Sequence, residues 1–382
     1  MLTDLAALGC AGLAGAGIVQ AAVGYGLLRR KQREVAPQLA IWPAITVLKP
    51  LCGDEALLEA ALGSFCTQDY PEFQLVFGVQ SAADPALETV ARLKQRFPRV
   101  AIDVVVDATR HGRNAKVGNL LNMFPSARHD LIVIADSDIH APPDTLRSVA
   151  AALMQPGVGL VSTLYTGLPA TGSLAGALGA AQINHSFLPG ALMARRLGRQ
   201  DCLGAIMALR RDTLARIGGL ASLSDHLADD ALLGQLVRDL GLRVELASAI
   251  PATTVPETRL SALIAHELRW MRTVKSVAPI GFVLGAMQYP LFWAALMVAA
   301  ESDLAAAWVG FLAVWLIRGT LAELSDRRLH STTRLPMWCI PIRDMLSVAM
   351  ILASYRSNRV AWRGKEYRVT PFSEAVLQPG KG

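Results

Sequence analysis

The stretch LIVIADSDIH, residues 131–140, places five apolar residues directly before Asp136-Ser137-Asp138. The apolar run has the length and composition of a buried strand. An ordinary turn after such a strand needs at most one acidic side chain. Two carboxylates two residues apart at a strand end can bind one divalent cation such as Mg²⁺ or Mn²⁺, directly or through water. The alternative is a solvated turn that leads into the following helix.

Similar apolar runs alternate with amphipathic segments between residues 45 and 255. Several runs are rich in Val and Ile, which favours strands. This alternation predicts an α/β domain with a mostly parallel sheet that helices cover on both faces. Ligands of such a sheet bind at the carboxyl ends of its strands, where Asp136 and Asp138 lie. The predicted strands are 45–48, 73–79, 102–106, 131–135 and 159–163, and the predicted helices are 54–68, 84–96, 114–122 and 143–154.

The composition points to a membrane protein. Of the 382 residues, 52% are hydrophobic and only 18% are charged, which is too apolar for an ordinary soluble enzyme. Residues 5–28 form an uncharged run long enough to span a bilayer, and the basic segment 29–33 follows it. A signal peptide would carry its positive charge before the apolar run. The positive-inside rule therefore places the N-terminus outside and the following residues in the cytoplasm; a buried helix of a soluble protein is the alternative.

Three further apolar runs lie near the C-terminus. Residues 277–300 and 304–321 are predicted to form a transmembrane hairpin. The run 336–355 contains Arg343 and Asp344, and basic segments flank it on both sides. Because both flanks are expected in the cytoplasm, we predict that this run is interfacial or re-entrant, which leaves three true spans. The expected parts are an N-terminal transmembrane helix with its basic flank (1–34), a cytoplasmic catalytic domain (35–275), a transmembrane hairpin with an interfacial helix (276–355) and a basic cytoplasmic tail (356–382).

Several classes of protein are disfavoured. The five cysteines are scattered and form no C-x-x-C pair, so neither a zinc site nor a disulfide framework is expected. Neither a P-loop motif nor a G-x-G-x-x-G motif occurs. The net charge is +6, but no basic stripe interleaved with aromatic residues is present, so nucleic acid is not an expected partner. Basic clusters instead suit an anionic membrane surface or a phosphate-bearing substrate.

Two lysines are candidate phosphate ligands. Lys49 closes the first predicted strand, and Lys116 ends the basic segment 110–116. Cationic groups near a strand end can hold phosphates. A solvated loop is the alternative for the basic segment, and it is the preferred interpretation of Arg110 and Arg113.

Two further acidic sites lie outside the D-x-D motif. Asp84 follows the predicted strand 73–79 and is either a helix cap or a functional acid. Asp229 and Asp230 precede an amphipathic helix predicted over residues 231–240. Acids at a helix start are often only favourable partners of the helix dipole. A carboxylate there could also act as a general base toward an acceptor hydroxyl.

The segment HELRW, residues 266–270, precedes the transmembrane hairpin. A Trp beside an Arg at that depth is commonly a membrane-interface anchor. The arginine could also neutralise a diphosphate leaving group.

The order of these motifs resembles the processive-type GT-A glycosyltransferases, and more closely the ceramide glucosyltransferase family with its bacterial hopanoid-associated branch. The resemblance covers nearly the whole chain and implies a GT-A domain with a Rossmann-like, nucleotide-sugar-binding sheet, plus transmembrane and interfacial helices. It rests on the blocks LKPLCGDE, DYPEFQLVFGVQ, ADPA, IADSDI, PDTL, GVGLVS, ARIGGL, HLADD, HELRW and WRGKEYRV.

The resemblance implies a role for each acid. Asp84 matches the acid that contacts the nucleotide. Asp136 and Asp138 match the motif that binds the metal and the diphosphate. Asp230 matches the catalytic base. Ala231 and Leu232 follow it where many family members have an aromatic residue, so acceptor packing is expected to differ.

Further donor contacts are implied for Lys49, Lys116 and the HELRW segment. Arg269 and Trp270 match the end of the family signature Q/R-x-x-R-W. His266 stands where that signature has Gln or Arg, although a histidine still donates a hydrogen bond.

The resemblance implies a multi-pass enzyme of the bacterial inner membrane, with its catalytic domain in the cytoplasm. It would be inverting and dependent on Mg²⁺ or Mn²⁺, and would transfer a hexose from a UDP-sugar to a lipid hydroxyl. The favoured pair is N-acetylglucosamine and a hopanoid; ceramide with UDP-glucose is the alternative. A non-catalytic membrane scaffold with a degenerate transferase domain is the alternative of another class. The intact acids and Arg269 argue against the scaffold.

Overall fold

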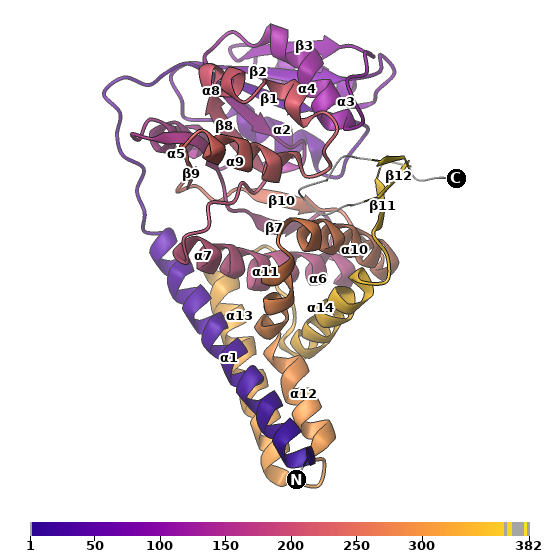
Figure 1. The fold of residues 1–382 in the computed structure, drawn as a ribbon. Helices are drawn as coiled ribbons and strands as arrows, with labels where there is room; N and C mark the ends of the chain where they lie inside the picture. Colours follow the sequence, from indigo (N-terminus) through magenta and orange to yellow (C-terminus); the bar gives the residue numbers. More distant parts are fainter. Residues whose placement is uncertain (1, 363–364, 369–377, 380–382) are drawn as a thin grey trace.

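The computed structural model describes residues 2–362, 365–368 and 378–379. Figure 1 shows a domain built around a sheet at the top, a layer of helices beneath it and a narrow tip at the bottom. The tip is formed by α1 (Leu2–Lys31), α12 (Pro290–Ala300) and α13 (Ala305–Arg328), and it carries the N-terminus. The predicted catalytic domain and the predicted membrane helices therefore lie at opposite ends of the molecule.

The large sheet has seven strands in the order β3-β2-β1-β4-β8-β6-β9. All neighbouring pairs are parallel except those of β8, which is antiparallel to β4 and β6. The predicted mostly parallel sheet is therefore confirmed. The strands are β1 (Ile45–Pro50), β2 (Phe73–Val79), β3 (Ala101–Val106), β4 (Leu131–Ala135), β6 (Val158–Ser162), β8 (Ile206–Arg210) and β9 (Arg243–Leu246).

Two apolar cores cover the two faces of the sheet. In β4, Val133 belongs to one core, while Ile132 and Ile134 belong to the other, as the alternation of side chains along a strand requires. Because both faces are covered, the strand is apolar throughout. The first core includes residues of α2 (Leu58–Cys66), α3 (Ala86–Arg96) and α5 (Thr145–Leu153); the second includes residues of α4 (Ala115–Met123), α8 (Arg211–Arg216), η3 (Leu220–Leu223) and α9 (Asp229–Asp239).

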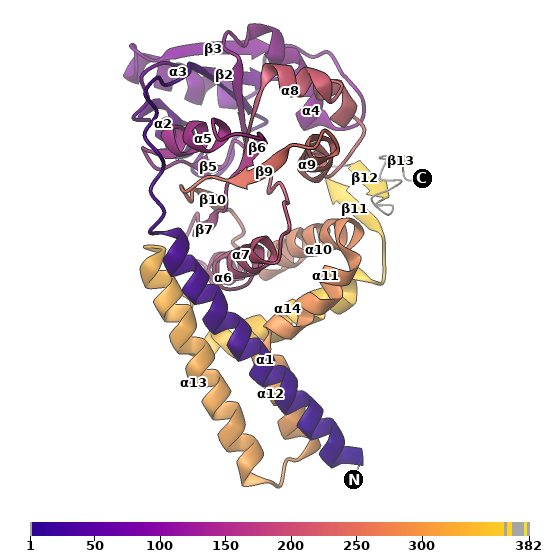
Figure 2. The same ribbon diagram turned by 60° about the vertical axis from the view of Figure 1, so that its left-hand side comes forward.

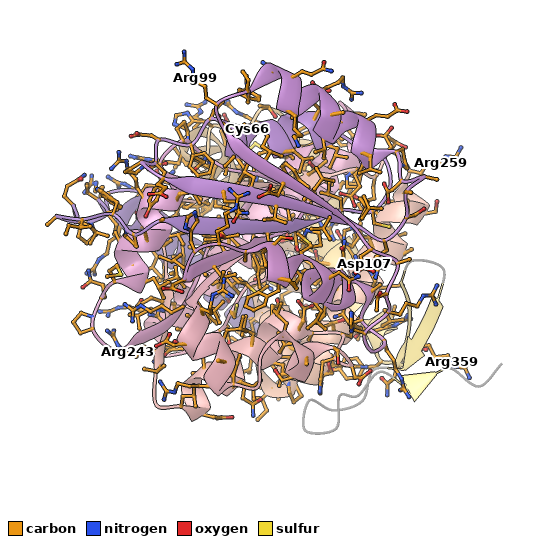
Figure 3. All side chains as sticks on the ribbon, turned by 90° about the horizontal axis from the view of Figure 1, so that it is seen from above. Cys66, Arg99, Asp107, Arg243, Arg259 and Arg359 are labelled. Atoms are coloured by element: carbon orange, nitrogen blue, oxygen red, sulfur yellow. The ribbon has the colours of Figure 1, made fainter. Side chains whose placement is uncertain are left out.

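The chain order creates a switch point in the large sheet. Strands β1, β2 and β3 follow one another outward on one side, and β4 then returns to the other side of β1. The carboxyl ends of β1 and β4 therefore lie side by side where successive connections diverge, the usual place for a ligand in an open α/β sheet. Figure 3 places Asp107, directly after β3, on the same side of the molecule as Arg259 and Arg359, and opposite Arg99 and Arg243.

Two small sheets were not expected from the sequence. One has the order β5-β10-β7 and the other β11-β12-β13. Their strands have two to four residues, too few to give a periodic signal: β5 (Ile139–His140), β7 (Thr166–Pro169), β10 (Ala252–Val255), β11 (Arg359–Trp362), β12 (Lys365–Arg368) and β13 (Gln378–Pro379). Because β5 follows β4 so closely, the D-x-D motif connects the large sheet to a small one.

A layer of helices lies between the sheet domain and the tip (Figures 1 and 2). It contains α6 (Leu174–Gln182), the π-helical turn η2 (Ile183–Phe187), α7 (Leu188–Arg196), α10 (Leu260–Val277), α11 (Pro279–Leu284) and α14 (Ile340–Ser354). Helix α6 continues without interruption through η2 into α7. The remaining short turns are η1 (Phe124–Ser126), η4 (Gly285–Gln288) and η5 (Met337–Cys339).

The first arm of the predicted hairpin is not one straight helix. The run 277–300 is divided into α11, η4 and α12, with a 65° bend before Pro290. Proline has no amide hydrogen to donate and clashes with the preceding turn, so a helix commonly bends or restarts there. Helix α12 has 11 residues, about 16 Å at 1.5 Å per residue, and is too short to cross a bilayer alone.

Within the part of the chain that the structure describes, three helices are long and apolar enough to cross a membrane, and the bent pair would make a fourth span. They cover Asp4–Lys31, Ala305–Arg328 and Met337–Ser354. The last contains Arg343 and Asp344, which are both packed on protein. The interfacial or re-entrant position of this helix stays a prediction. Of the predicted tail 356–382, residues 363–364, 369–377 and 380–382 lie outside the described part of the chain.

Candidate active site

The D-x-D motif is fixed at the end of β4 by its neighbours. The Asp136 amide donates to the carbonyl of Ala205 at 3.2 Å. Asp138 accepts a hydrogen bond at 2.6 Å from the Thr253 hydroxyl through Oδ2, and its carbonyl accepts from the Thr254 amide. Burial raises the pKa of Asp138 to about 6, and Asp136 adds to this. The Asp138 carboxylate is thus held by β10, whereas Asp136 is anchored through its backbone and its side chain remains 37% exposed.

Lys116 bridges two acids of the site. Its ammonium lies 2.7 Å from Asp136 Oδ1 and 3.5 Å from Asp229 Oδ2. The lysine is in the first turn of α4, where the Asn114 side chain caps the helix by accepting from the amides of Lys116 and Val117. Burial lowers the pKa of Lys116, but the surrounding carboxylates, Asp136 first, raise it to a net value above the ordinary one. The group is therefore a cation held between carboxylates.

Lys49 lies behind the motif. It is fully buried, its Nζ donates to the Asp136 carbonyl at 2.7 Å, and it sits 3.8 Å from the centre of the Phe65 ring. Burial lowers its pKa to about 7, against the opposing influence of Asp138 and Asp136. The structure places Lys49 as a support of the strand end. Its contact with a phosphate stays a prediction.

Asp84 connects two loops at the carboxyl end of the sheet. Its carboxylate accepts from the Gly53 amide at 3.0 and 3.1 Å and from the Ala86 amide at 3.0 Å. The latter bond caps the start of α3, as the simple interpretation of the sequence expected. Within the loop after β1, Glu55 accepts from the Ser137 hydroxyl at 2.5 Å. The loop is therefore attached both to Asp84 and to the D-x-D motif.

The acidic pair opens α9 and its two members differ. Asp230 accepts at 2.8 Å from the Ala231 amide, and a Cβ on Gly204 would lie 2.7 Å from Asp230 Oδ2. Burial raises the pKa of Asp230 to about 7, and the neighbouring Asp229 adds to this. A carboxylate with such a pKa is suited to accept a proton near neutral pH. Asp229 is more buried and does not cap the helix; it faces Lys116 instead.

The HELRW segment lies on α10, in the layer below the sheet domain. His266 Nδ1 lies 2.5 Å from Glu257 Oε1. Burial raises the pKa of Glu257, but the hydrogen bond and charge of His266, together with Arg269, lower it to a net value below the ordinary one. His266 is thus engaged by Glu257 in this structure. Trp270 packs against Phe187 with 5.2 Å between ring centres and the two rings tilted by 53°.

A row of aromatic rings connects α10 to the carboxylates, and the sequence analysis did not identify it. Phe187, at the end of the π-helical turn, contacts Trp270 on one side and Tyr165, at 4.6 Å, on the other. Burial raises the pKa of Tyr165, and Asp230, Asp138 and Asp136 raise it further, so the phenol lies in their electrostatic field. The three residues are far apart in the sequence and share no spacing. Only the position of Tyr165 shortly after a buried strand could have drawn attention to it.

The structure thus brings most predicted residues to one end of the sheet. Asp136, Asp138, Lys116 and the acidic pair gather there, with Lys49 behind them. Asp84 lies on the adjoining loop, and α10 approaches from the side of the apolar helices through the aromatic row.

The carboxylate oxygens of Asp136 and Asp138 suit a hard cation that is also bound by a diphosphate. Within the residues described, no three His, Cys, Asp or Glu side chains are grouped to hold a metal. Mg²⁺ is usually held by one or two carboxylates plus substrate phosphates, and Asp136 and Asp138 supply such carboxylates. The Lys116 ammonium between Asp136 and Asp229 indicates that the acids attract a positive charge. Asp136 and Asp138 would therefore hold the metal together with the nucleotide.

Comparison with known proteins places this arrangement among glycosyltransferases. The family model described as "Glycosyl transferase family 21" matches residues 11–375. Ceramide glucosyltransferase 1 of Caenorhabditis elegans is 21% identical over 353 residues, which cover 89% of this chain and 74% of that protein. Ceramide glucosyltransferase 3 of the same organism is 23% identical over 243 residues, covering 62% of this chain and about half, 52%, of its own length.

A solved structure supports the fold. The mannosyltransferase of Pyrobaculum calidifontis, in complex with GDP-Man and Mn²⁺, superposes with a TM-score of 0.54. The alignment has 20% sequence identity and covers 92% of this chain and 99% of the other. The predicted GT-A-like fold is thereby confirmed.

Proposed function

The chain belongs to glycosyl transferase family 21, and from this premise we propose that it transfers a hexose from a UDP-sugar to a hydroxyl of a membrane lipid, with inversion. The observation that carries the proposal is the position of Asp230. It lies with Asp136 and Lys116 at the carboxyl end of β4, its pKa is raised to about 7, and the aromatic row leads from there to the membrane-side helices.

Asp230 is the base in this reaction. As the lipid oxygen forms its bond to the anomeric carbon, the hydroxyl proton moves to the Asp230 carboxylate. The bond between the anomeric carbon and the diphosphate breaks on the opposite side, and its electron pair leaves with UDP. Approach and departure on opposite faces of the sugar give inversion.

The leaving diphosphate requires positive charge around it. Lys116 now donates toward Asp136, and the same ammonium can turn to a phosphate oxygen that arrives beside it. Arg269 is proposed to contribute from α10. A divalent cation held by Asp136 and Asp138 would supply further charge neutralisation when bound. Asp84 is proposed to orient the nucleotide from the adjoining loop.

The donor and acceptor pair is the finer part of the proposal. The names of the two Caenorhabditis relatives favour ceramide and glucose. The hopanoid and N-acetylglucosamine pair is favoured by the HELRW variant, in which His266 replaces the Gln or Arg of the signature. His266 bonds Glu257, so a donor contact by residue 266 would require that this pair opens.

The proposed location is a bacterial inner membrane, crossed several times, with the sheet domain in the cytoplasm. In support, the basic end of α1 faces the sheet domain and the N-terminus lies at the far tip (Figure 1). Labelling intact cells with a membrane-impermeant maleimide tests this topology. Asp303→Cys, in the loop between α12 and α13, should be labelled, and the exposed Cys52 should not. Labelling of Cys52 without labelling of residue 303 would indicate the opposite orientation in the membrane.

The activity is tested by incubating the purified protein with four substrate pairs. UDP-glucose and UDP-N-acetylglucosamine are each combined with ceramide and with a hopanoid alcohol in mixed micelles containing Mn²⁺. Mass spectrometry identifies the product, and NMR coupling of the anomeric proton gives its configuration. A product that retains the donor configuration would refute the inverting mechanism. A protein that neither transfers nor hydrolyses any sugar nucleotide would instead favour the scaffold alternative.

A further inference from the structure

The buried face of α10 has a charge at its centre. Its buried residues are Leu263, Glu267 and Met271, which are spaced four apart and therefore share one side of the helix. Glu267 lies between Leu263 and Met271 on this buried side of the helix and is only 4% exposed. A buried carboxylate of this kind needs a closely matched partner.

Arg343 of α14 is that partner. Its Nη1 and Nη2 lie 2.7 and 2.8 Å from the two carboxylate oxygens of Glu267, which is a bidentate contact. Arg343 also donates to the Leu178 carbonyl of α6 at 3.3 Å and to the Ser347 hydroxyl at 3.1 Å. Ser347 in turn donates to Gln182 of α6 at 2.9 Å. One buried arginine thus joins α10, α14 and α6.

Both helices that Arg343 joins to α14 lead to the active site. Glu267 is two residues before Arg269 and three before Trp270 on α10. Helix α6 continues through the π-helical turn to Phe187, whose ring lies between those of Trp270 and Tyr165. A slip of α10 by one residue would turn its side chains by about 100° and shift them about 1.5 Å, which would separate Trp270 from Phe187.

Apolar contacts alone would leave this register less defined. Apolar side chains pack with little directional preference, whereas a bidentate arginine–carboxylate contact fixes distance and orientation together. Replacing a buried ion pair by well-packed apolar residues is often neutral or stabilising, so stability alone gives little reason for a charge here.

We propose that Glu267 and Arg343 are a positioning pair, which fixes α10 against α14 and α6 and thereby holds Arg269 and Trp270 at the reacting sugar nucleotide. This inference rests on the proposed function, in which Arg269 neutralises the diphosphate. It assigns a role to Arg343, one of the two charged residues inside the apolar run 336–355.

The decisive variant replaces both partners by apolar residues, Glu267→Met with Arg343→Leu. We expect its thermal midpoint of unfolding to stay close to that of the parent, because no charge is left unpaired. Its kcat should nevertheless fall roughly 100-fold, the loss that a displacement of about 1 Å can cause. Its Kd for UDP in the presence of Mn²⁺ should rise as Arg269 moves away.

A second variant guards against failure of the first to fold. Arg343→Lys keeps the charge but loses the bidentate geometry, so kcat should fall by about tenfold with near-normal stability. Glu245→Gln, which breaks the partly exposed Arg195–Glu245 pair between α7 and β9, is the matched control and should change kcat less than about twofold. A double variant that folds and keeps the kcat and UDP affinity of the parent overturns the proposal. If the double variant does not fold, an Arg343→Lys protein with the kcat of the parent overturns it instead.

The outcomes separate this inference from the proposed function. If the parent protein transfers sugar to no lipid but binds UDP, the proposed function fails. The UDP affinities of the variants then still report whether the pair positions Arg269.

Discussion

Two charged regions of this molecule are built in opposite ways. At the carboxyl end of β4, Asp136 and Asp229 contact the Lys116 ammonium, Asp138 and Asp230 lie close by, and Lys49 lies behind Asp136. In the helix layer below and at the adjoining end of α13, buried acids have single partners: Glu267 pairs with Arg343 and Asp344 with Arg318 at 3.7 Å, and Asp326 lies 3.0 Å from the His185 ring. The first region has an excess of negative charge, and the second is paired.

The difference indicates what each region is for. Carboxylates that repel one another raise the free energy of the unliganded protein, and a cation with its diphosphate partner relieves that repulsion. Acids that already have a partner gain no further charge compensation from a ligand. We infer that they instead fix the positions of the helices that carry them. The following predictions test this contrast, beginning with the largest expected effect.

Asp230→Asn removes the basic electron pair and keeps the size of the side chain. General-base catalysis typically contributes about 10²–10⁴-fold, so kcat should fall by at least about 100-fold. Binding of UDP, measured by titration calorimetry, should survive. Asp239→Asn at the other end of α9 is the control and should behave like the parent.

Asp229→Asn should lower kcat less than Asp230→Asn does, but it should weaken UDP binding, because Asp229 faces Lys116. Equal losses of kcat in the Asp229→Asn and Asp230→Asn variants would contradict the assignment.

Asp136→Asn tests whether the unbalanced acids await a cation. Losing one electrostatic contact to a developing charge typically costs about 10²–10³-fold in kcat, and excess Mn²⁺ should restore little of it. The parent enzyme should lose activity in EDTA and regain it with Mn²⁺ or Mg²⁺. Full activity in EDTA would remove the metal from the mechanism and leave Lys116 as the cation of the site.

The pH dependence of the activity tests the titration of Asp230 in the first region. Because the pKa of Asp230 is raised to about 7, this carboxyl is protonated below that pH and cannot accept the acceptor proton. The value of kcat/KM should therefore rise about tenfold per pH unit below 7 and level off above it. Asp230→Asn should lose this rise in its residual activity. A flat profile in the parent between pH 5.5 and 8 would exclude Asp230 as the titrating base.

Tyr165→Phe is expected to have the smallest effect. It keeps the ring that packs against Phe187 and removes only the hydroxyl, whose pKa the nearby carboxylates raise. We expect this hydroxyl to hydrogen-bond the bound acceptor; such a bond contributes about 0.5–1.5 kcal/mol, so kcat/KM should fall by roughly two- to tenfold. Tyr165→Ala also removes the stacked ring and should raise the acceptor KM further, with the donor KM unchanged. If both variants change only the donor KM, Tyr165 belongs to the donor side.

Most of the candidate site residues were accessible from the sequence, because each follows a strand or opens a helix. The strand Leu131–Ala135 and the acids after it could be predicted from local patterns, and the GT-A fold from the order of the motifs. Asp84, Asp136, Asp138 and the pair Asp229-Asp230 were identified on this basis, and the resemblance then selected Asp230. Local patterns are sufficient there because strand periodicity and helix starts depend on neighbouring residues.

Only the tertiary structure decided the relations between distant segments. It placed Lys49 behind Asp136, joined Tyr165 to Trp270 through Phe187, and paired Glu267 with Arg343 across 76 positions. It also divided the apolar run 277–300 at Pro290, although apolar composition alone favoured one helix. The physical reason is that burial and ion pairing depend on which surfaces meet. Hydropathy and periodicity describe one segment at a time, whereas the partner of a buried charge is set by the packing of the whole chain.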